Sequence, residues 1–109
     1  MMPEPITPAD LKRRLDAGEA LTLLDVREAE ELAIARIDGA LHMPMGDVPM
    51  RSVELDPDSP TPVVCICHHG IRSAHVAAFL ESRDFAGVLN LEGGIDRWAA
   101  EVDPSMARY

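Results

Sequence analysis

The sequence predicts an α/β domain in which a mostly parallel sheet is covered by helices on both faces. Three observations predict this class: short apolar runs recur along the chain, helical patterns stand between them, and glycine or proline marks several boundaries. The strongest apolar run is continuous rather than alternating, as is typical of strands buried on both faces of a parallel sheet. With 109 residues, the chain is expected to form one domain over 1–109.

The first part of the chain is expected to form a helix, a strand and a short helix. Thr7 can cap a helix that has Pro8 in its first turn and stops at Gly18. Residues 21–26 are a short apolar run and predict a buried strand. Residues 28–34 predict a short helix, because acidic residues in its first turn complement the helix dipole.

The middle of the chain is expected to contain one short strand and a long connection. Residues 39–43 predict the strand. Residues 47–62 are rich in proline, aspartate and serine, so they predict an irregular segment. Pro57, Pro60 and Pro62 argue against regular structure in this segment.

The last part of the chain is expected to alternate strand and helix twice. Residues 63–67 give the strongest strand pattern, because they are apolar, continuous and rich in β-branched side chains. Apolar residues at helical spacing predict a helix over about 73–83, and residues 87–91 predict a last short strand. A glycine pair follows at 93–94. The final amphipathic helix is marked by Ile95, Trp98 and Val102.

Composition disfavours several classes of function. The formal charge of −9 disfavours nucleic acid and anionic membrane surfaces as partners. No apolar run approaches the roughly 18–20 residues that span a bilayer, and the first ten residues lack the pattern of a secretory signal. The expected location is therefore the cytoplasm.

The two cysteines, Cys65 and Cys67, are not expected to form a disulfide or a metal site. A bridge between them would close a very small loop and add little stability. A zinc site would need a second ligand pair at suitable spacing, and the neighbouring His68 and His69 point in different directions. We therefore expect no metal.

Chemistry is expected just after the strongest strand, because sites in parallel sheets lie past the carboxyl ends of strands. Cys67 ends this strand and is the candidate nucleophile. The loop after it can curl so that its N–H groups point inward, and the following helix adds its positive end, so that the thiolate is stabilised. The candidate loop residues are His68, His69, Gly70, Ile71, Arg72 and Ser73.

The charge distribution near this loop favours an anionic substrate. Residues 59–80 contain no Asp or Glu, although they contain Arg72 and the three histidines 68, 69 and 75. The plainer explanation is that a buried strand and a core helix lack charges. Other structural readings also stay open: Arg72 could pair with a surface acid, and Ser73 could serve only as a helix cap. Cys65 is interpreted as a buried apolar residue.

Four segments of the chain resemble motifs of single-domain rhodanese proteins, in the expected order. They are Leu24–Glu28, Ile37–Pro44, the loop segment Cys67–Ser73 and Leu91–Trp98. The resemblance covers about residues 6–102, which is taken as the domain core. It implies a three-layer α/β/α domain around a five-stranded, largely parallel sheet.

The resemblance also implies a sulfurtransferase that needs no cofactor. Cys67 would take a sulfur from a small anionic donor such as thiosulfate, hold it as a persulfide, and pass it to cyanide, a thiol or a sulfur-accepting protein. Arg72 and the two loop histidines would attract the donor. No nucleic acid or membrane partner is implied.

Three alternatives remain open. Related phosphatases place five residues between the cysteine and the arginine of their loop, whereas four stand between Cys67 and Arg72, which predicts a smaller cradle. A non-catalytic binding module is disfavoured because Cys67 is present. A redox role would have Cys65 resolve an oxidised Cys67, although a bridge two residues apart would be strained.

Overall fold

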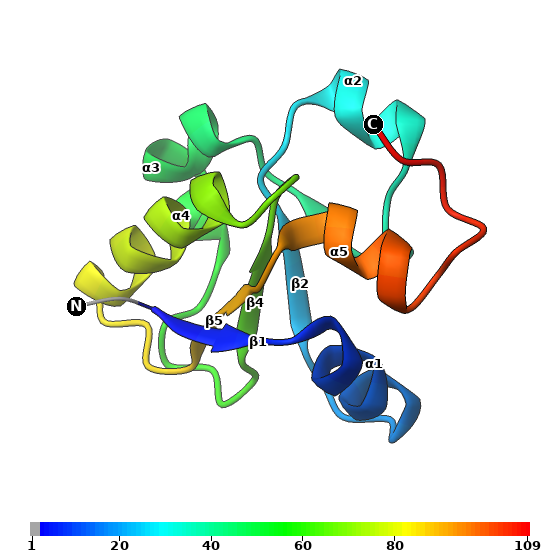
Figure 1. Ribbon diagram of the computed structural model, residues 1–109. Helices are drawn as coiled ribbons and strands as arrows, with labels where there is room; N and C mark the ends of the chain where they lie inside the picture. The colour runs from blue at the N-terminus through cyan, green and yellow to red at the C-terminus, as the bar shows by residue number, and fades with distance from the viewer. Residues whose placement is uncertain (1–2) are drawn as a thin grey trace.

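The computed structural model describes residues 3–109 and shows a five-stranded sheet with helices on both faces (Figure 1). The strand order is β1-β5-β4-β2-β3, and each pair of neighbours is parallel. The strands are β1 (Glu4–Ile6), β2 (Thr22–Asp25), β3 (Leu41–His42), β4 (Val63–Ile66) and β5 (Val88–Leu91). The predicted α/β/α architecture is confirmed, and the sheet is parallel throughout.

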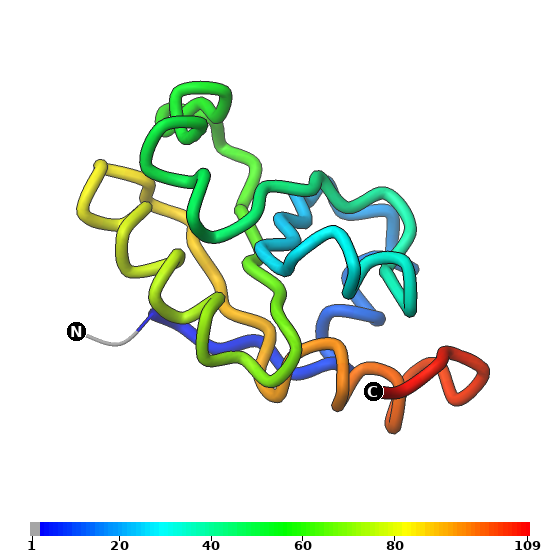
Figure 2. Tube along the Cα trace, turned by 90° about the horizontal axis from the view of Figure 1, so that it is seen from above, coloured from blue at the N-terminus to red at the C-terminus, as the bar shows by residue number. Residues whose placement is uncertain are grey.

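The sheet separates the core into two layers, and helices cover each of them. The helices are α1 (Pro8–Asp16), α2 (Ala29–Ile34), α3 (Val48–Arg51), α4 (Ile71–Ser82) and α5 (Gly94–Glu101). On one face, Val76 and Leu80 of α4 pack against Leu24 and Cys65 of the sheet. On the other face lie α1 and α5, whose buried residues include Leu11, Ile95 and Trp98. Figure 2 shows the red C-terminal segment leaving α5 and turning back toward the body of the molecule.

The local signals explain most of these elements. The Thr7 side chain accepts a hydrogen bond of 3.1 Å from the Asp10 N–H, so Thr7 caps α1 as predicted. All four residues of β4 are buried, which is why its sequence is continuous in apolar residues. β4 ends at Ile66, one residue before Cys67, and α4 begins at Ile71, two residues earlier than predicted.

Two parts of the fold differ from the prediction. The strand β1 was not predicted, because it has only three residues, includes Pro5, and pairs with β5 alone at the edge of the sheet. The segment 47–62 was expected to be irregular, but its first part forms α3 between two 3-10 turns. Pro49 lies in the first turn of α3, where the missing N–H of proline is tolerated.

A buried ion pair fixes the segment after β2. Arg27 is 0% exposed, and its Nη2 lies 2.7 Å from a carboxylate oxygen of Asp25 at the end of β2. Arg27 also donates to the carbonyl oxygens of Glu31 and Ala35, at 3.3 and 2.8 Å. Because a buried charge must be paired and hydrogen bonded, these contacts hold α2 at the carboxyl edge of the sheet.

Within residues 3–109, no helix is both long and apolar enough to cross a membrane.

Candidate active site

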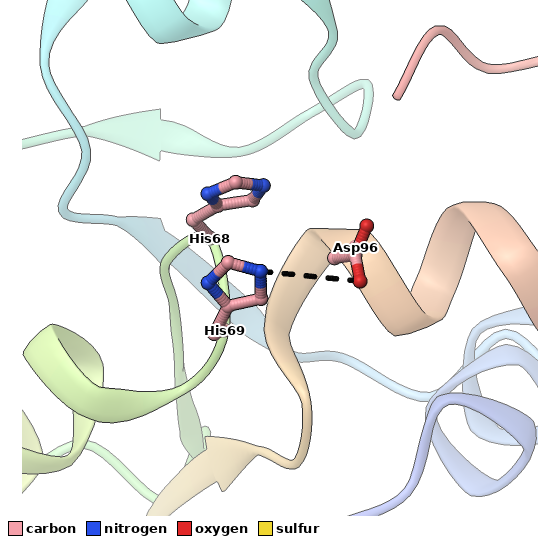
Figure 3. Close-up of side chains that lie close together, drawn as sticks. All are labelled: His68, His69 and Asp96. Atoms are coloured by element: carbon pink, nitrogen blue, oxygen red, sulfur yellow. Dashed lines mark ion pairs between the residues drawn. The ribbon is translucent and has the colours of Figure 1, made fainter. Parts of the chain in front are cut away.

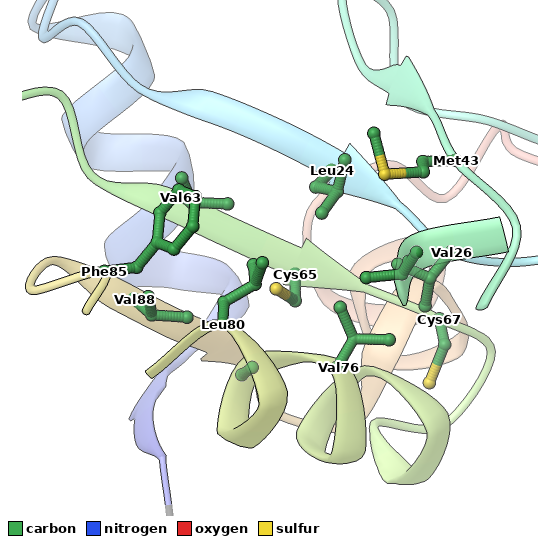
Figure 4. Close-up of a cluster of buried hydrophobic side chains, with 12 residues drawn as sticks. Leu24, Val26, Met43, Val63, Cys65, Cys67, Val76, Leu80, Phe85 and Val88 are labelled. Carbon is green, nitrogen blue, oxygen red and sulfur yellow. The ribbon is translucent and has the colours of Figure 1, made fainter. Parts of the chain in front are cut away.

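Cys67 lies directly after β4, at the beginning of the loop that leads into α4. Its sulfur accepts a hydrogen bond from the Gly70 N–H at 3.1 Å and lies 3.2 Å from the Ser73 hydroxyl oxygen. In Figure 4 this sulfur points toward the first turn of α4, whereas the Cys65 sulfur lies among apolar side chains deeper in the core. Cys67 is only 1% exposed, so its thiol is buried beneath the loop.

The N-terminus of α5 holds the beginning of this loop. The N–H groups of Ile95 and Asp96 donate to the carbonyl oxygens of Cys67 and His68, at 2.8 and 3.1 Å. Gly94 makes this approach possible, because a Cβ at this position would lie 2.5 Å from the Cys67 carbonyl oxygen. The motif 91–98 therefore positions the nucleophile, a role that its sequence alone did not indicate.

The second part of the loop turns at Gly70. This residue has a φ of +98°, in the left-handed region, and it is the N-cap of α4. Its carbonyl oxygen accepts hydrogen bonds from the Ala74 N–H at 3.3 Å and from Asn90 Nδ2 at 3.0 Å. Asn90, on β5, thus binds the loop through its side chain, and sequence reasoning missed it because it stands outside the Cys67–Ser73 segment.

Ser73 has a role other than capping. It is the third residue of α4, is fully buried, and points its hydroxyl at the Cys67 sulfur. The same hydroxyl oxygen lies 2.5 Å from Asn90 Oδ1. Ser73 therefore connects the nucleophile to β5.

Arg72 is not free to face an incoming anion. Its guanidinium nitrogens lie 2.7 and 2.9 Å from the two carboxylate oxygens of Glu31 on α2. The hydrogen bonds from Arg72, and a further one from Tyr109, hold the pKa of Glu31 at about 2. The interpretation of Arg72 as the partner of an acidic side chain thus describes the structure better than the interpretation of Arg72 as a free charge that attracts the sulfur donor.

The two loop histidines meet Asp96 and Tyr109 at the outer side of the loop. The Nε2 of His69 lies 4.0 Å from a carboxylate oxygen of Asp96 (Figure 3). The His68 ring stacks on the Tyr109 ring with centroids 3.8 Å apart, and its Nε2 lies 2.8 Å from the Tyr109 backbone oxygen. Carboxylates from α2 and α5 therefore surround a segment that has none in its own sequence.

His68, His69 and Asp96 are also a geometric candidate for a metal site, since their ligand atoms lie within 4.8 Å of one another. Each is engaged otherwise: Asp96 accepts from Arg108 at 3.1 Å, and the two imidazole rings lie against each other with centroids 3.8 Å apart. The ligand set considered from the sequence combined both cysteines with the two histidines. In the structure the group that comes together contains Asp96 in place of the cysteines.

Tyr109 is a further residue that sequence reasoning missed. Its hydroxyl accepts a hydrogen bond from Arg27 at 2.9 Å and donates one to Glu31 at 2.7 Å. Burial raises the pKa of Tyr109, so it remains a neutral donor. Tyr109 links the buried Arg27 to the Glu31–Arg72 pair and covers the outer side of His68.

Comparison with known proteins shows one family over nearly the whole chain. The family model described as rhodanese-like domain matches residues 7–101. The putative sulfurtransferase YtwF of Bacillus subtilis is 42% identical over 99 residues, which are 91% of this chain and 93% of that protein. The thiosulfate sulfurtransferase GlpE of Pseudomonas putida is 30% identical over 103 residues, 93% of this chain and 90% of that protein.

The fold is similar over the same extent. The crystal structure of a rhodanese-related protein from Thermoplasma volcanium matches with a TM-score of 0.81 and 32% sequence identity. This match covers 91% of the present chain and 93% of that chain.

Proposed function

Because this chain belongs to the rhodanese-like domain family, we propose that it transfers a sulfane sulfur from an anionic donor such as thiosulfate through a persulfide on Cys67. Relatives named as sulfurtransferases support a sulfurtransferase role. The observation that carries the proposal is the placing of the Gly70 N–H and the Ser73 hydroxyl against the Cys67 sulfur, at the start of the loop that leads into α4.

The first step forms the persulfide. The Cys67 thiolate attacks the outer sulfur of thiosulfate, a new sulfur–sulfur bond forms, and the bond to the sulfonate sulfur breaks. Sulfite leaves with the electron pair of that bond. The loop amides and the positive end of α4 stabilise the anionic sulfur that remains on Cys67.

The second step regenerates the enzyme. Cyanide or a thiolate attacks the outer sulfur of the persulfide, and the bond between the two sulfurs breaks. The electron pair returns to Cys67, which is again a thiolate, and the product is thiocyanate or a new persulfide. The acceptor can be a small molecule or the thiol of another protein.

The loop itself, rather than Arg72, would hold the donor anion. The Arg72 charge is neutralised by Glu31, so backbone N–H groups and the helix terminus supply the attraction. The phosphatase alternative loses support from the same pair, because an arginine that is bound to Glu31 is not directed at a phosphoryl group. A reducing compartment such as the cytoplasm would keep both free cysteines reduced.

Intact-mass measurement tests the proposal. After exposure to thiosulfate and removal of the excess, the wild-type protein should gain the mass of one sulfur atom, and peptide mapping should place it on Cys67. Cys67→Ser should gain nothing, and cyanide should remove the added sulfur from the wild type as thiocyanate. A sulfur found on Cys65, or an equal mass gain in Cys67→Ser, would rule the proposal out.

A further inference from the structure

Asn90 closes a ring of hydrogen bonds around the nucleophile. Its Nδ2 donates to the Gly70 carbonyl oxygen at 3.0 Å, and its Oδ1 lies 2.5 Å from the Ser73 hydroxyl oxygen. Gly70 and Ser73 in turn each contact the Cys67 sulfur, at 3.1 and 3.2 Å. Asn90 is therefore hydrogen bonded to both of the residues that contact the Cys67 sulfur.

The Gly70 carbonyl fixes the orientation of the Asn90 amide. A carbonyl oxygen can only accept, so the Asn90 atom that faces it must be the NH₂ group. The atom that faces Ser73 is then Oδ1, which can only accept as well. It follows that the contact between Asn90 and Ser73 requires the serine hydroxyl as donor.

The Ser73 hydroxyl has one hydrogen and two neighbouring acceptors. When Cys67 is a neutral thiol, its S–H can donate to the Ser73 oxygen while the Ser73 hydroxyl donates to Asn90. When Cys67 is a thiolate, its sulfur has no hydrogen, and the Ser73 hydroxyl must turn away from Asn90 to donate to it. The Gly70 N–H faces the sulfur and can donate to it in both states.

We propose that Asn90 is a positioning residue that competes with the Cys67 sulfur for the Ser73 hydroxyl hydrogen and so limits the share of Cys67 that is thiolate. The inference rests on the proposed function in that it concerns the same nucleophile. In the persulfide the negative charge lies on the outer sulfur, so the hydroxyl returns to Asn90. The Ser73 hydroxyl therefore donates to the Cys67 sulfur only in those steps of the transfer cycle in which that sulfur carries the negative charge.

The surroundings of Asn90 allow it to be replaced without rebuilding the core. It is partly exposed and lines a cavity of about 370 Å³ on the outer side of the loop, together with His69, Gly70 and Glu92. The Gly70 carbonyl keeps its hydrogen bond from the Ala74 N–H when Asn90 is changed. His69 and Glu92 are the titratable residues that line this cavity with Asn90, and Cys67 contacts the Ser73 hydroxyl; all three are common to the variants below.

The test is the alkylation rate of Cys67 by iodoacetamide at pH 7, in which the thiolate displaces iodide and forms a carbon–sulfur bond. Asn90→Leu removes the competing acceptor at similar volume, so it should react about fivefold faster than the wild type, the effect of one net hydrogen bond. Asn90→Asp offers a stronger acceptor and a negative charge, so it should react more slowly. Peptide mapping confirms that Cys67 is the labelled residue, and thermal unfolding confirms that each variant is folded.

The matched control is the same pair of substitutions in a Ser73→Ala background. Without the hydroxyl there is nothing to compete for, so Asn90→Leu should change the alkylation rate less than twofold there. The proposal is overturned if Asn90→Leu fails to speed alkylation of the otherwise wild-type protein. It is also overturned if Asn90→Leu speeds alkylation equally in both backgrounds, since this would indicate that the substitution only makes the Cys67 thiol more accessible to iodoacetamide. Alkylation needs no sulfur donor, so a chain that fails to form a persulfide still reports on Asn90, and the two proposals fail separately.

Discussion

Glu31 and Arg72 stand 41 positions apart in the chain, yet their side chains meet in a paired contact with nitrogen–oxygen distances of 2.7 and 2.9 Å. Arg72 lies in the first turn of α4, directly after the loop that begins with the nucleophile, and Glu31 belongs to α2, which the buried Arg27 holds in place. The Glu31 carboxylate therefore neutralises the Arg72 charge beside the loop, and the same ion pair contributes to the stability of the fold.

Removal of the Glu31 charge should strengthen binding of the anionic donor. Glu31→Gln keeps the shape of the side chain but leaves the Arg72 charge uncompensated, so the KM for thiosulfate should fall by roughly three- to fivefold. Steady-state kinetics at low ionic strength measure this, and the gain should shrink at high salt. Glu54→Gln is the control, because Glu54 pairs with Arg51 on a different segment. A KM that is unchanged or raised in Glu31→Gln would contradict the prediction.

The same pair should make stability depend on pH in the acid range. The pKa of Glu31 is lowered from 4.5 to about 2 in the folded protein, chiefly by the hydrogen bonds from Arg72. A carboxyl group with a lowered folded pKa stabilises the protein above its unfolded pKa, and this stabilisation is lost as the pH falls from about 4.5 toward 2. It amounts to at most about 3 kcal/mol.

Urea unfolding between pH 6 and pH 2 measures this dependence. The free energy of unfolding of the wild type should fall more steeply than that of Glu31→Gln over the acid range. Parallel curves would show that the pair contributes no net stability. Glu54→Gln should show only a small effect, because the Glu54 side chain is exposed and its partner Arg51 is partly exposed, so solvent screens the pair.

The parts of the molecule that could be predicted from the sequence are those that depend on neighbouring residues. The buried strand β4 is visible because a strand covered on both faces needs a continuous apolar run. The loop after it is visible because the cysteine, Gly70 and the helix start follow one another within five residues, 67–71. The Thr7 cap is a local hydrogen bond and was predicted from its residue type.

The parts that could not be predicted depend on contacts between distant segments. The absence of carboxylates from residues 59–80 suggested an uncompensated positive loop, but the fold places Glu31 of α2 and Asp96 of α5 beside it. Asn90 is separated from Ser73 by 17 positions, and Tyr109 from Arg27 by 82. A linear charge pattern gives no information on such pairs, because the topology of the sheet decides which segments meet.

Cys65 should be dispensable for sulfur transfer. Burial raises the pKa of its thiol to about 12, so it is neutral at physiological pH and a poor nucleophile. Cys65→Ser should keep most of the transfer activity but lower the free energy of unfolding by about 1–2 kcal/mol, because it places a hydroxyl in the apolar core. Thiosulfate-to-cyanide kinetics and urea unfolding measure the two quantities. Loss of turnover in a folded Cys65→Ser protein would show that Cys65 takes part in the reaction.

A methyl group at Gly94 should disturb both the fold and the reaction. Gly94 has a φ of +62°, and a Cβ there would overlap the carbonyl oxygens of Cys67 and His68, which accept hydrogen bonds from α5. The loop or the helix must therefore shift in Gly94→Ala, which would move the donors that surround the nucleophile. Gly39→Ala is the matched control, since Gly39 also has a positive φ of +85° but has no atom within 4 Å of the added Cβ.

The two variants share the backbone strain of alanine at positive φ, about 1–2 kcal/mol, and differ in the collision. Gly94→Ala should therefore lose more free energy of unfolding than Gly39→Ala and should lose most of its sulfur transfer, whereas Gly39→Ala should keep its activity. Urea unfolding and thiosulfate-to-cyanide kinetics measure the two effects on the same preparations. If the two variants lost equal stability and kept equal activity, the N-terminus of α5 would not be what holds the loop around Cys67.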